Sequence, residues 1–402
     1  MTQTINESEL QRARKLYEQA FGALPAGARA VVVHAPGRSE IAGNHTDHEG
    51  GHVIAGALDV AVTGVAAPNG TRTLRHASEG YPLYEISLDD LDVSTDEYQS
   101  TPGLARGMAH ALAQTGREPA GFNLATVCTI PAGGGLSSSA AIEALLGRAM
   151  EALWEGPEVS PVELACMSQE VETDYFGKPC GLMDQLSVCL GGLAFMDFAD
   201  RKNPRSTKLD YSFDDAGYAL CLVDVGCDHT PFTADYNAVP LEMQQVAAAL
   251  GHERLCEVDK DAFDARIPEL REQLGDRAVL RAIHYWRDNG LVDARWEALQ
   301  ANDIDRFLEL TRESGASSAM FLQNVSAGGT YQPAMLALGL AEHFLHGRGA
   351  SRIHGGGFGG SIQAFVPLDL VDGFIDHMDA WLGEGSARRY KIEQEGAWAA
   401  WL

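Results

Sequence analysis

The chain has 402 residues, of which 45% are hydrophobic and 21% are charged, a composition typical of a globular protein with a large core. Its 56 acidic and 30 basic residues give a net charge of −26, which argues against nucleic acid or an anionic membrane as a partner. No apolar run approaches the roughly 18 residues of a membrane span, and the seven cysteines are scattered, never in Cys-x-x-Cys spacing. We therefore expect a cytoplasmic monomer with free thiols, in which any anionic small-molecule substrate needs a local basic lining.

The N-terminal part of the chain begins with apolar elements and then becomes polar. An amphipathic helix is predicted over residues 7–21, and a buried strand over residues 30–33. The segment 35–51 combines titratable and amide side chains with glycines, so we predict a loop there. Residues 53–65 are apolar again. The polar side chains of the predicted loop include Arg38, Glu40, Asn44, His45, Asp47 and His48.

Residues 131–141, Pro-Ala-Gly-Gly-Gly-Leu-Ser-Ser-Ser-Ala-Ala, lie between a predicted strand and a predicted helix. The strand covers residues 122–130, and the helix follows with apolar residues at three- and four-residue steps. Glycines let backbone N–H groups point at one spot, and a helix N-terminus adds unpaired donors and a partial positive charge. A glycine-serine run alone favours a flexible loop, but the helix directly after it favours a phosphate cradle.

Two better-known nucleotide motifs are excluded. The chain contains no Gly-x-x-x-x-Gly-Lys-Ser/Thr sequence, so it has no Walker-type loop. The second glycine cluster, residues 355–360, fits Gly-x-Gly-x-x-Gly, but a predicted strand over residues 361–366 follows it where a dinucleotide-binding turn must open a helix. We therefore predict a tight turn for this cluster, packed against another part of the protein.

The middle of the chain carries a helix with clear start signals. Ser160, Pro161 and Glu163 match an N-cap, a first-turn proline and a capping-box acid. Glu172 lies near the far end of this helix. Residues 180–185, Cys-Gly-Leu-Met-Asp-Gln, follow soon after it.

A shift in composition divides the chain into two parts. Residues 200–203 are polar and charged, so we predict a boundary between a domain over residues 1–200 and a domain over residues 201–402. Beyond the boundary, periodicity predicts a strand, then three helices, a strand and a last helix. They cover residues 218–225, 239–250, 304–310, 333–345, 361–366 and 370–381.

Three of these stretches, residues 38–51, 131–141 and 355–360, together resemble the three motifs of the GHMP small-molecule kinases. The first is also similar to the galactokinase signature Gly-Arg-x-Asn-x-Ile-Gly-Glu-His-x-Asp. Residues 179–185 resemble the galactokinase segment that carries the catalytic aspartate. The resemblance covers about residues 31–366, with the motifs in the right order, which is unlikely to arise by chance.

The resemblance implies a mixed α/β fold of the α+β type. In this two-domain GHMP kinase fold, an S5-like N-terminal domain and a ferredoxin-like C-terminal domain enclose an active site in the cleft between them. The last residues are expected to pack back on the N-terminal domain.

The resemblance also implies residues that bind ATP and Mg²⁺. Ser139 and Glu172 would hold the metal, and a hydroxyl and one carboxylate beside phosphate oxygens suit a hard cation that keeps its waters. From the residues alone, a solvated helix face explains Glu172 and its acidic neighbours better. The residues expected to bind ATP are Gly133, Gly134, Gly135, Leu136, Ser137, Ser138, Ser139 and Ala140.

Asp184 matches the catalytic aspartate, and Arg38 matches an arginine that lies beside it. A nearby guanidinium favours the ionised carboxylate, so Asp184 is expected to accept the proton of a sugar hydroxyl. Without the family, a helix cap explains Asp184 equally well. The positions that match sugar-binding residues are Glu40, Asn44, His45, Asp47, Gly181 and Tyr236.

The sugar motif departs from the family pattern in two ways. Glu40 and Asn44 stand where the family has Asn and Glu, and His48 replaces a Tyr. Position 44 normally contacts the sugar near its C6 hydroxyl, so a different C6 group, such as the carboxylate of galacturonate, would fit. We also hypothesise that Glu40 and Asn44 contact each other, because the exchange then keeps one carboxylate facing one amide. The alternative is that Glu40 is solvated and that Asn44 alone alters the pocket near C6.

The expected activity is ATP- and Mg²⁺-dependent phosphorylation of D-galactose at its anomeric hydroxyl. The first alternative is a 1-kinase for galacturonate or another C6-modified sugar. The second is a non-catalytic sugar sensor that binds ATP and sugar. The third is a metal-binding protein that uses His45, Asp47 and His48.

Overall fold

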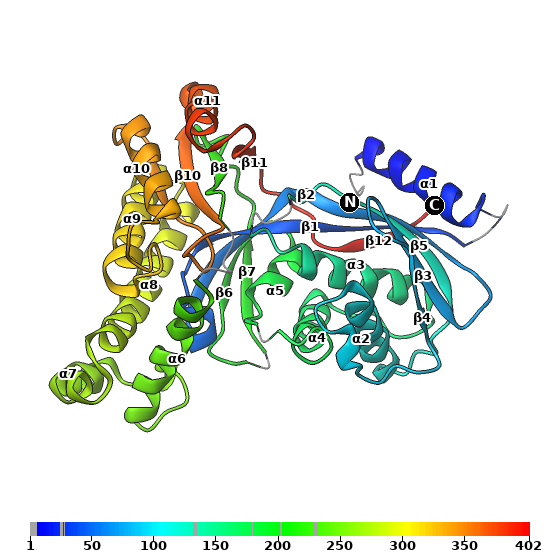
Figure 1. Cartoon of the computed structure of the whole chain (residues 1–402), viewed down its shortest axis with the longest axis horizontal. Helices are drawn as coiled ribbons and strands as arrows, with labels where there is room; N and C mark the ends of the chain where they lie inside the picture. Colours follow the sequence, from blue (N-terminus) through cyan, green and yellow to red (C-terminus); the bar gives the residue numbers. More distant parts are fainter. Residues whose placement is uncertain are drawn as a thin grey trace.

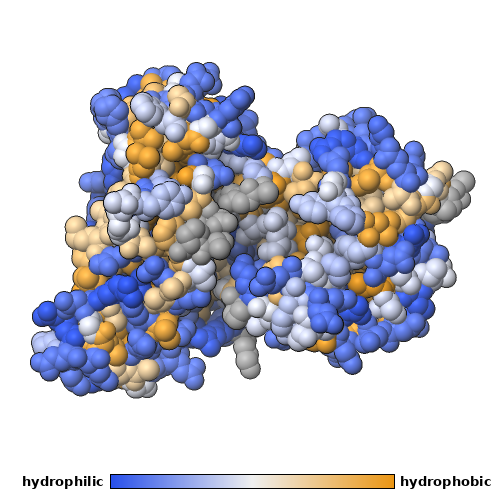
Figure 2. Space-filling model, in the orientation of Figure 1, coloured by the Kyte–Doolittle hydropathy of each residue, from blue (hydrophilic) through white to orange (hydrophobic). Residues whose placement is uncertain are grey.

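The computed structural model describes residues 6–24, 27, 29–131, 135–178, 180–201, 203–227 and 232–402. The described elements form two β-sheets, each covered by helices, in a mixed α/β fold (Figure 1). Hydrophilic residues cover most of the face seen in Figure 2, and the outline is notched between the two parts. No helix in these ranges is long and apolar enough to cross a membrane.

The larger sheet has eight strands in the described part of the chain, and their order is β12-β1-β2-β5-β3-β4, with β6 on β2 and β7 on β6. The β3–β5 pair is parallel, and the other pairs are antiparallel. The strands are β1 (Val31–Ala42), β2 (His52–Pro68), β3 (Thr73–Ser78), β4 (Tyr84–Ser87), β5 (Phe122–Cys128), β6 (Leu193–Asp197), β7 (Arg205–Leu209) and β12 (Trp398–Trp401).

Helices cover both faces of this sheet, because successive apolar side chains along its strands point to opposite faces. On β2, Val65 and Ala67 pack with Ala13 and Tyr17 of α1 (Glu7–Phe21), whereas Ala66 belongs to the main core on the other face. Figure 1 shows α1 alone on its side of the sheet, opposite the remaining helices of this part. Those helices are α2 (Thr101–Gln114), α3 (Ser138–Leu153), α4 (Pro161–Asp174) and α5 (Met183–Leu190).

The smaller sheet, in the order β11-β8-β10-β9, lies beside the ends of β1 and β2 (Figure 1). Its helices pack in two further apolar clusters, one against the sheet and one among the helices themselves. The strands are β8 (Tyr218–Asp224), β9 (Ala350–Ile353), β10 (Ser361–Pro367) and β11 (Ala387–Tyr390). The helices are α6 (Thr233–Ala249), α7 (Lys260–Leu274), α8 (Asp276–Gln300), α9 (Ile304–Ser317), α10 (Pro333–Leu345) and α11 (Val371–Leu382).

Two connections cross the expected boundary at residue 200. Strand β7 pairs with β6 and extends the larger sheet to Leu209, and β12 returns near the end of the chain to pair with β1. The division into residues 1–200 and 201–402 therefore stays a prediction.

The prediction of a loop over residues 35–51 is wrong for its first half. Residues 35–42 continue β1, and two register shifts against β2, after Pro36 and after Glu40, absorb the irregular sequence. The polar side chains of this half are buried because each has a polar partner. Ser39 and Glu40 face Gln363 and Arg352 of the smaller sheet, and Arg38 pairs with a carboxylate of α5. The second half holds the short 3₁₀ turn Asp47–Glu49.

Candidate active site

A bidentate ion pair between Arg38 and Asp184 lies at the centre of the candidate site. Arg38 comes from β1, and Asp184 comes from the first turn of α5. The Nε and Nη2 atoms of Arg38 donate to the two carboxylate oxygens of Asp184, each at 2.7 Å. The Asp184 side chain keeps 31% of its surface exposed, whereas that of Arg38 keeps 8%. The guanidinium therefore fixes the carboxylate without closing it off from a ligand.

The environment keeps Asp184 ionised. Burial alone raises the pKa of this carboxyl, but the charge of Arg38 and its hydrogen bonds, together with the hydrogen bond from Ser137, outweigh burial and hold the pKa below its ordinary value. At neutral pH the carboxylate can accept a proton. Asp184 does not act as a helix cap, because Leu182 is the N-cap residue of α5.

The predicted phosphate loop closes over this ion pair. Its Gly133 and Gly134 lie outside the described residues. The carbonyl oxygen of Gly135 accepts a hydrogen bond from Arg38 Nη1 at 2.5 Å, and that of Leu136 accepts one from the Arg38 backbone at 3.2 Å. The loop therefore reaches the same arginine that holds Asp184.

Ser137 turns the loop into α3. It is the N-cap residue of α3 in a left-handed conformation, and its hydroxyl donates to Asp184 instead of capping the helix. The first N–H groups of α3 thus lack this side-chain cap, which suits a bound anion. Ser138 is exposed, Ser139 is half-buried and Ala140 is buried.

Ser139 and Glu172 lie together, as the predicted metal site requires. Ser139 Oγ donates to Glu172 Oε1 at 3.1 Å. The other oxygen, Oε2, accepts from Gln185 Nε2 at 2.5 Å, so the carboxylate is fixed from behind. Glu172 is 2% exposed, so the alternative of a solvated helix face is wrong. A hydroxyl and a held carboxylate oxygen are hard donors that fit Mg²⁺.

The side chains predicted to bind sugar gather beside Asp184. Asp47 Oδ2 lies so close to the Cα of Gly181 that a Cβ there would overlap it. The ring of His45 stands edge-on to Tyr236 at 5.7 Å between centroids, and its Nε2 lies 2.9 Å from the carbonyl oxygen of Gly356. Burial lowers the pKa of His45 to about 3, so the ring is neutral and donates from Nε2.

The histidine metal site that was considered as an alternative is not formed. His45 Nε2 faces a carbonyl oxygen, and His45 Nδ1 lies 3.2 Å from His48 Nε2. Across the described residues, no three His, Cys, Asp or Glu side chains are grouped to hold a metal ion.

Glu40 and Asn44 contact each other, as hypothesised, and Glu40 is 3% exposed, so the alternative of a solvated Glu40 is wrong. Asn44 Nδ2 donates to Glu40 Oε1 at 2.9 Å and to the Gly355 carbonyl oxygen at 2.6 Å. Arg352 Nη2 donates to the same Glu40 oxygen at 2.8 Å. The Asn44 side-chain oxygen accepts two further bonds, and Asn44 is 0% exposed. These two donors are Ser318 and Asn324.

Comparison with known proteins agrees with this geometry. The family model "GHMP kinases N terminal domain" matches residues 103–192, which include the phosphate loop, Glu172 and Asp184. The model "Galactokinase galactose-binding signature" matches residues 15–68, which include β1 and the sugar motif. The chain thus carries the N-terminal domain of the GHMP kinases. It carries the signature of the galactokinase branch of that family.

Solved GHMP kinases share the whole fold. A galactokinase from Lactococcus lactis, solved with galactose, is 24% identical, covers 96% of this chain and 99% of its own, and has a TM-score of 0.81. The mevalonate kinase of Methanococcus jannaschii is 15% identical, with 92% and 100% coverage and a TM-score of 0.63. A phosphomevalonate kinase of Streptococcus pneumoniae, solved with phosphomevalonate and AMPPNP, is 14% identical, with 89% and 99% coverage and a TM-score of 0.62.

The sequence did not indicate that three further side chains lie beside the proposed metal site. Lys178 Nζ lies 3.3 Å from Glu172 Oε1. Gln185 donates to both Glu172 and the buried Glu143. Burial and the charge of Glu172 raise the pKa of Glu143 well above its ordinary value. One signal was present, because Glu143 follows Ser139 by four residues and so shares its face of α3.

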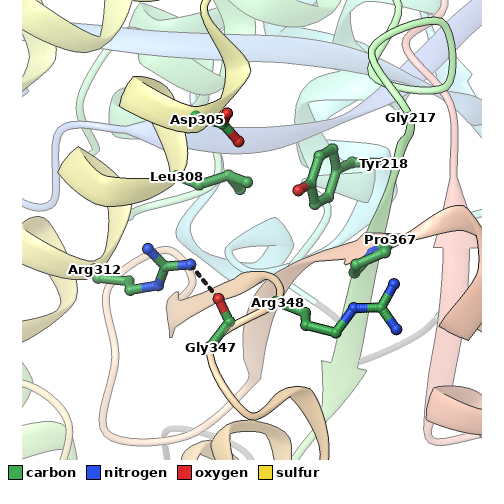
Figure 3. Close-up of a pocket in the computed structure, with 8 residues that line it drawn as sticks. All are labelled: Gly217, Tyr218, Asp305, Leu308, Arg312, Gly347, Arg348 and Pro367. Atoms are coloured by element: carbon green, nitrogen blue, oxygen red, sulfur yellow. Dashed lines mark hydrogen bonds between the residues drawn. The ribbon is translucent and has the colours of Figure 1, made fainter.

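The pocket drawn in Figure 3 lies away from these motifs, between α9, β8 and the turn before β9. This open pocket has a volume of about 470 Å³, and Arg312 on its wall donates to the Gly347 carbonyl oxygen at 2.9 Å. None of the predicted site residues is among those that line it.

Proposed function

We propose that this GHMP kinase transfers the γ-phosphoryl group of ATP to the anomeric hydroxyl of D-galactose and forms α-D-galactose 1-phosphate. The observation that carries the proposal is the Arg38–Asp184 pair, which joins the galactose-binding signature to the phosphate loop. The fold shared with a galactokinase along 96% of the chain supports it.

In the proposed reaction, the anomeric oxygen forms a bond to the γ-phosphorus, and the bond from this phosphorus to the β,γ-bridging oxygen breaks to release ADP. The hydroxyl proton passes to a carboxylate oxygen of Asp184. Arg38 keeps that carboxylate ionised in the ground state and lies beside the charge that develops on the phosphoryl oxygens. Positioning and electrostatics supply most of the catalysis in such transfers.

We infer that Ser139 and Glu172 hold Mg²⁺, which would neutralise phosphate charge when bound. Ser139→Ala and Glu172→Gln should each weaken metal binding about 10- to 100-fold, the range seen when partners of a metal site are removed. Mn²⁺ binding in the presence of ADP, followed by electron paramagnetic resonance, measures this without turnover. Unchanged affinity in both variants would remove these residues from the metal site.

The sugar-contacting residues proposed are His45, Asp47, Tyr236 and the backbone of Gly181, with Glu40 and Asn44 behind them. A panel of hexoses with ATP and Mg²⁺ tests the substrate. We expect galactose to be phosphorylated and glucose to be poor. Preference for galacturonate would establish the C6-modified alternative, and ATP and sugar binding without ADP release would establish the sensor. A cytoplasmic monomer remains our expectation for the state in which it works.

A further inference from the structure

We propose that Lys178 is a further catalytic residue, whose ammonium group contacts the β- and γ-phosphates of ATP beside the metal site. This inference rests on the proposed function, since it requires ATP in the cleft. Lys178 belongs to the turn between α4 and α5, immediately before the segment that carries Asp184.

Two donors converge on one oxygen of Glu172. Lys178 Nζ lies 3.3 Å from Oε1, and Ser139 Oγ lies 3.1 Å from the same atom. Since Ser139 is in the first turn of α3, the ammonium lies next to the helix N-terminus that the phosphate loop leads into. Nucleotide phosphates bound at that N-terminus would come within reach of the lysine.

The backbone aims Lys178 back at this site. Gly177 has a positive φ of 74°, which reverses the chain after α4, and a Cβ at this position would come within 2.7 Å of the Tyr98 ring. The Lys178 N–H then donates to the Glu172 carbonyl oxygen at 3.0 Å. The turn thus fixes both the backbone and the side chain of Lys178 against Glu172.

Lys178 is the cation with capacity for a ligand. Among the described residues, Arg38 and Lys178 are the cations that contact Asp184 or Glu172. Arg38 already donates from Nε, Nη1 and Nη2 to protein oxygens and is buried. The Lys178 side chain is 62% exposed, against 3% for that of Glu172, and one ammonium with three donors can serve both Glu172 and a ligand.

The negative charge of the whole chain makes a cation at the phosphate site necessary. At a net charge of −26, the protein repels a polyphosphate unless cations line the site. The alternative explanation of the contact is that Lys178 only neutralises the buried Glu172. The two readings differ in what they predict for nucleotides with different numbers of phosphates.

Isothermal titration calorimetry with ATP, ADP and AMP, each with Mg²⁺ and with EDTA, separates them. We expect Lys178→Met to weaken ATP binding about tenfold in both conditions, the size of a lost charged hydrogen bond, and AMP binding less than twofold. Lys178→Arg should bind ATP within about threefold of wild type, since it keeps the charge. Lys260→Met, which removes an exposed lysine paired with Asp264, is the matched control.

Loss of less than threefold for ATP, equal loss for ATP and AMP, or loss only with Mg²⁺ would overturn the phosphate contact. Galactose binding, measured on the same preparations, reports whether the variants are folded. A wild-type protein that binds no ATP would overturn the proposed function together with this inference. A wild-type protein that binds ATP but phosphorylates another sugar would correct only the substrate, and the lysine is still tested.

Discussion

Two ion pairs formed by neighbouring residues of β1 have opposite characters. Arg38 pairs with Asp184, which is 31% exposed, whereas Glu40 pairs with Arg352, and both of those side chains are almost fully buried, at 4% and 0%. We call the residues around the first pair the reactive side, which consists of Arg38, Ser137, Ser139, Glu172 and Asp184. We call the second set the seam between β1 and the smaller sheet, made of Glu40, Asn44, Arg352 and His354.

The carboxyl groups of the two pairs shift in opposite directions. For Asp184, the charge and hydrogen bonds of Arg38 outweigh burial and lower the pKa. For Glu40, burial outweighs Arg352, and the charge of Asp288 adds to it, so the pKa is raised. Strand β1 therefore supplies Arg38, which keeps Asp184 ready to accept a proton. Two residues later it supplies Glu40, whose buried pair with Arg352 fixes β1 against the smaller sheet. The surroundings of each carboxyl group determine whether its pKa is lowered or raised.

The largest effect should come from breaking the reactive side. Asp184→Asn removes the proton acceptor and is expected to lower kcat by about 10²- to 10⁴-fold, the usual contribution of a general base. The galactose Kd, measured by calorimetry, should change only a few-fold, because the sugar has other partners. Asp264→Asn on α7 is the control. Turnover within a few-fold of wild type would show that Asp184 is not the base.

In the seam, we expect the effects of substitutions at positions 40 and 44 on stability to be coupled. Asn44→Glu sets a second carboxylate against Glu40, and Glu40→Asn leaves Arg352 without its charged partner, so each single variant should lose stability. The double variant restores one carboxylate and one amide, and we expect a coupling energy of about 0.5–3 kcal/mol in denaturant unfolding. Recovery should be partial, because Arg352 contacts residue 40. Strictly additive losses would show that the two side chains act independently.

The last expected effect concerns the pH dependence of stability. Burial lowers the pKa of His354 from 6.5 to about 3, and the ring lies between the hydroxyls of Ser39 and Ser361, at 3.1 and 2.8 Å. Between these pH values the unfolded chain binds more protons than the folded one, so stability falls as the pH falls below 6.5.

Each pH unit in this window costs about 1.4 kcal/mol for one such histidine. His354→Gln should reduce the slope of unfolding free energy between pH 6 and 4 by about that amount. The same substitution at the exposed His252 should leave the slope unchanged. Equal slopes for wild type and His354→Gln would contradict a buried neutral ring.

Elements with local causes could be predicted from the sequence. The capping box of Ser160 and Glu163 formed as predicted, and α10 covers the predicted residues 333–345. The continuation of β1 through Arg38 and Glu40 could not, because the partners of these side chains, Asp184 and Arg352, are 146 and 312 positions away in the sequence. Helices α2, α7 and α8 were also not predicted, although α8 is 25 residues long.

The site divides in the same way. Motif resemblance found Asp184, Arg38, Ser139 and Glu172, and the structure brings each pair into contact. The contact between Glu40 and Asn44 was one of two hypotheses, and the structure shows it. Lys178 was missed, because nothing in its own neighbourhood of the sequence shows that the turn after α4 directs it back onto the carboxylate of that helix.

The most direct test of the central claim, phosphoryl transfer to the anomeric oxygen of galactose, is NMR of the product. The enzyme should be incubated with ATP, Mg²⁺ and D-galactose labelled with ¹³C at C1, and ³¹P–¹³C coupling should then be recorded. We predict a single sugar phosphate, coupled to C1 and in the α configuration, that is absent from the Asp184→Asn sample. A sugar phosphate whose phosphorus shows no coupling to the labelled C1, or ADP released without any sugar phosphate, would contradict the proposed reaction.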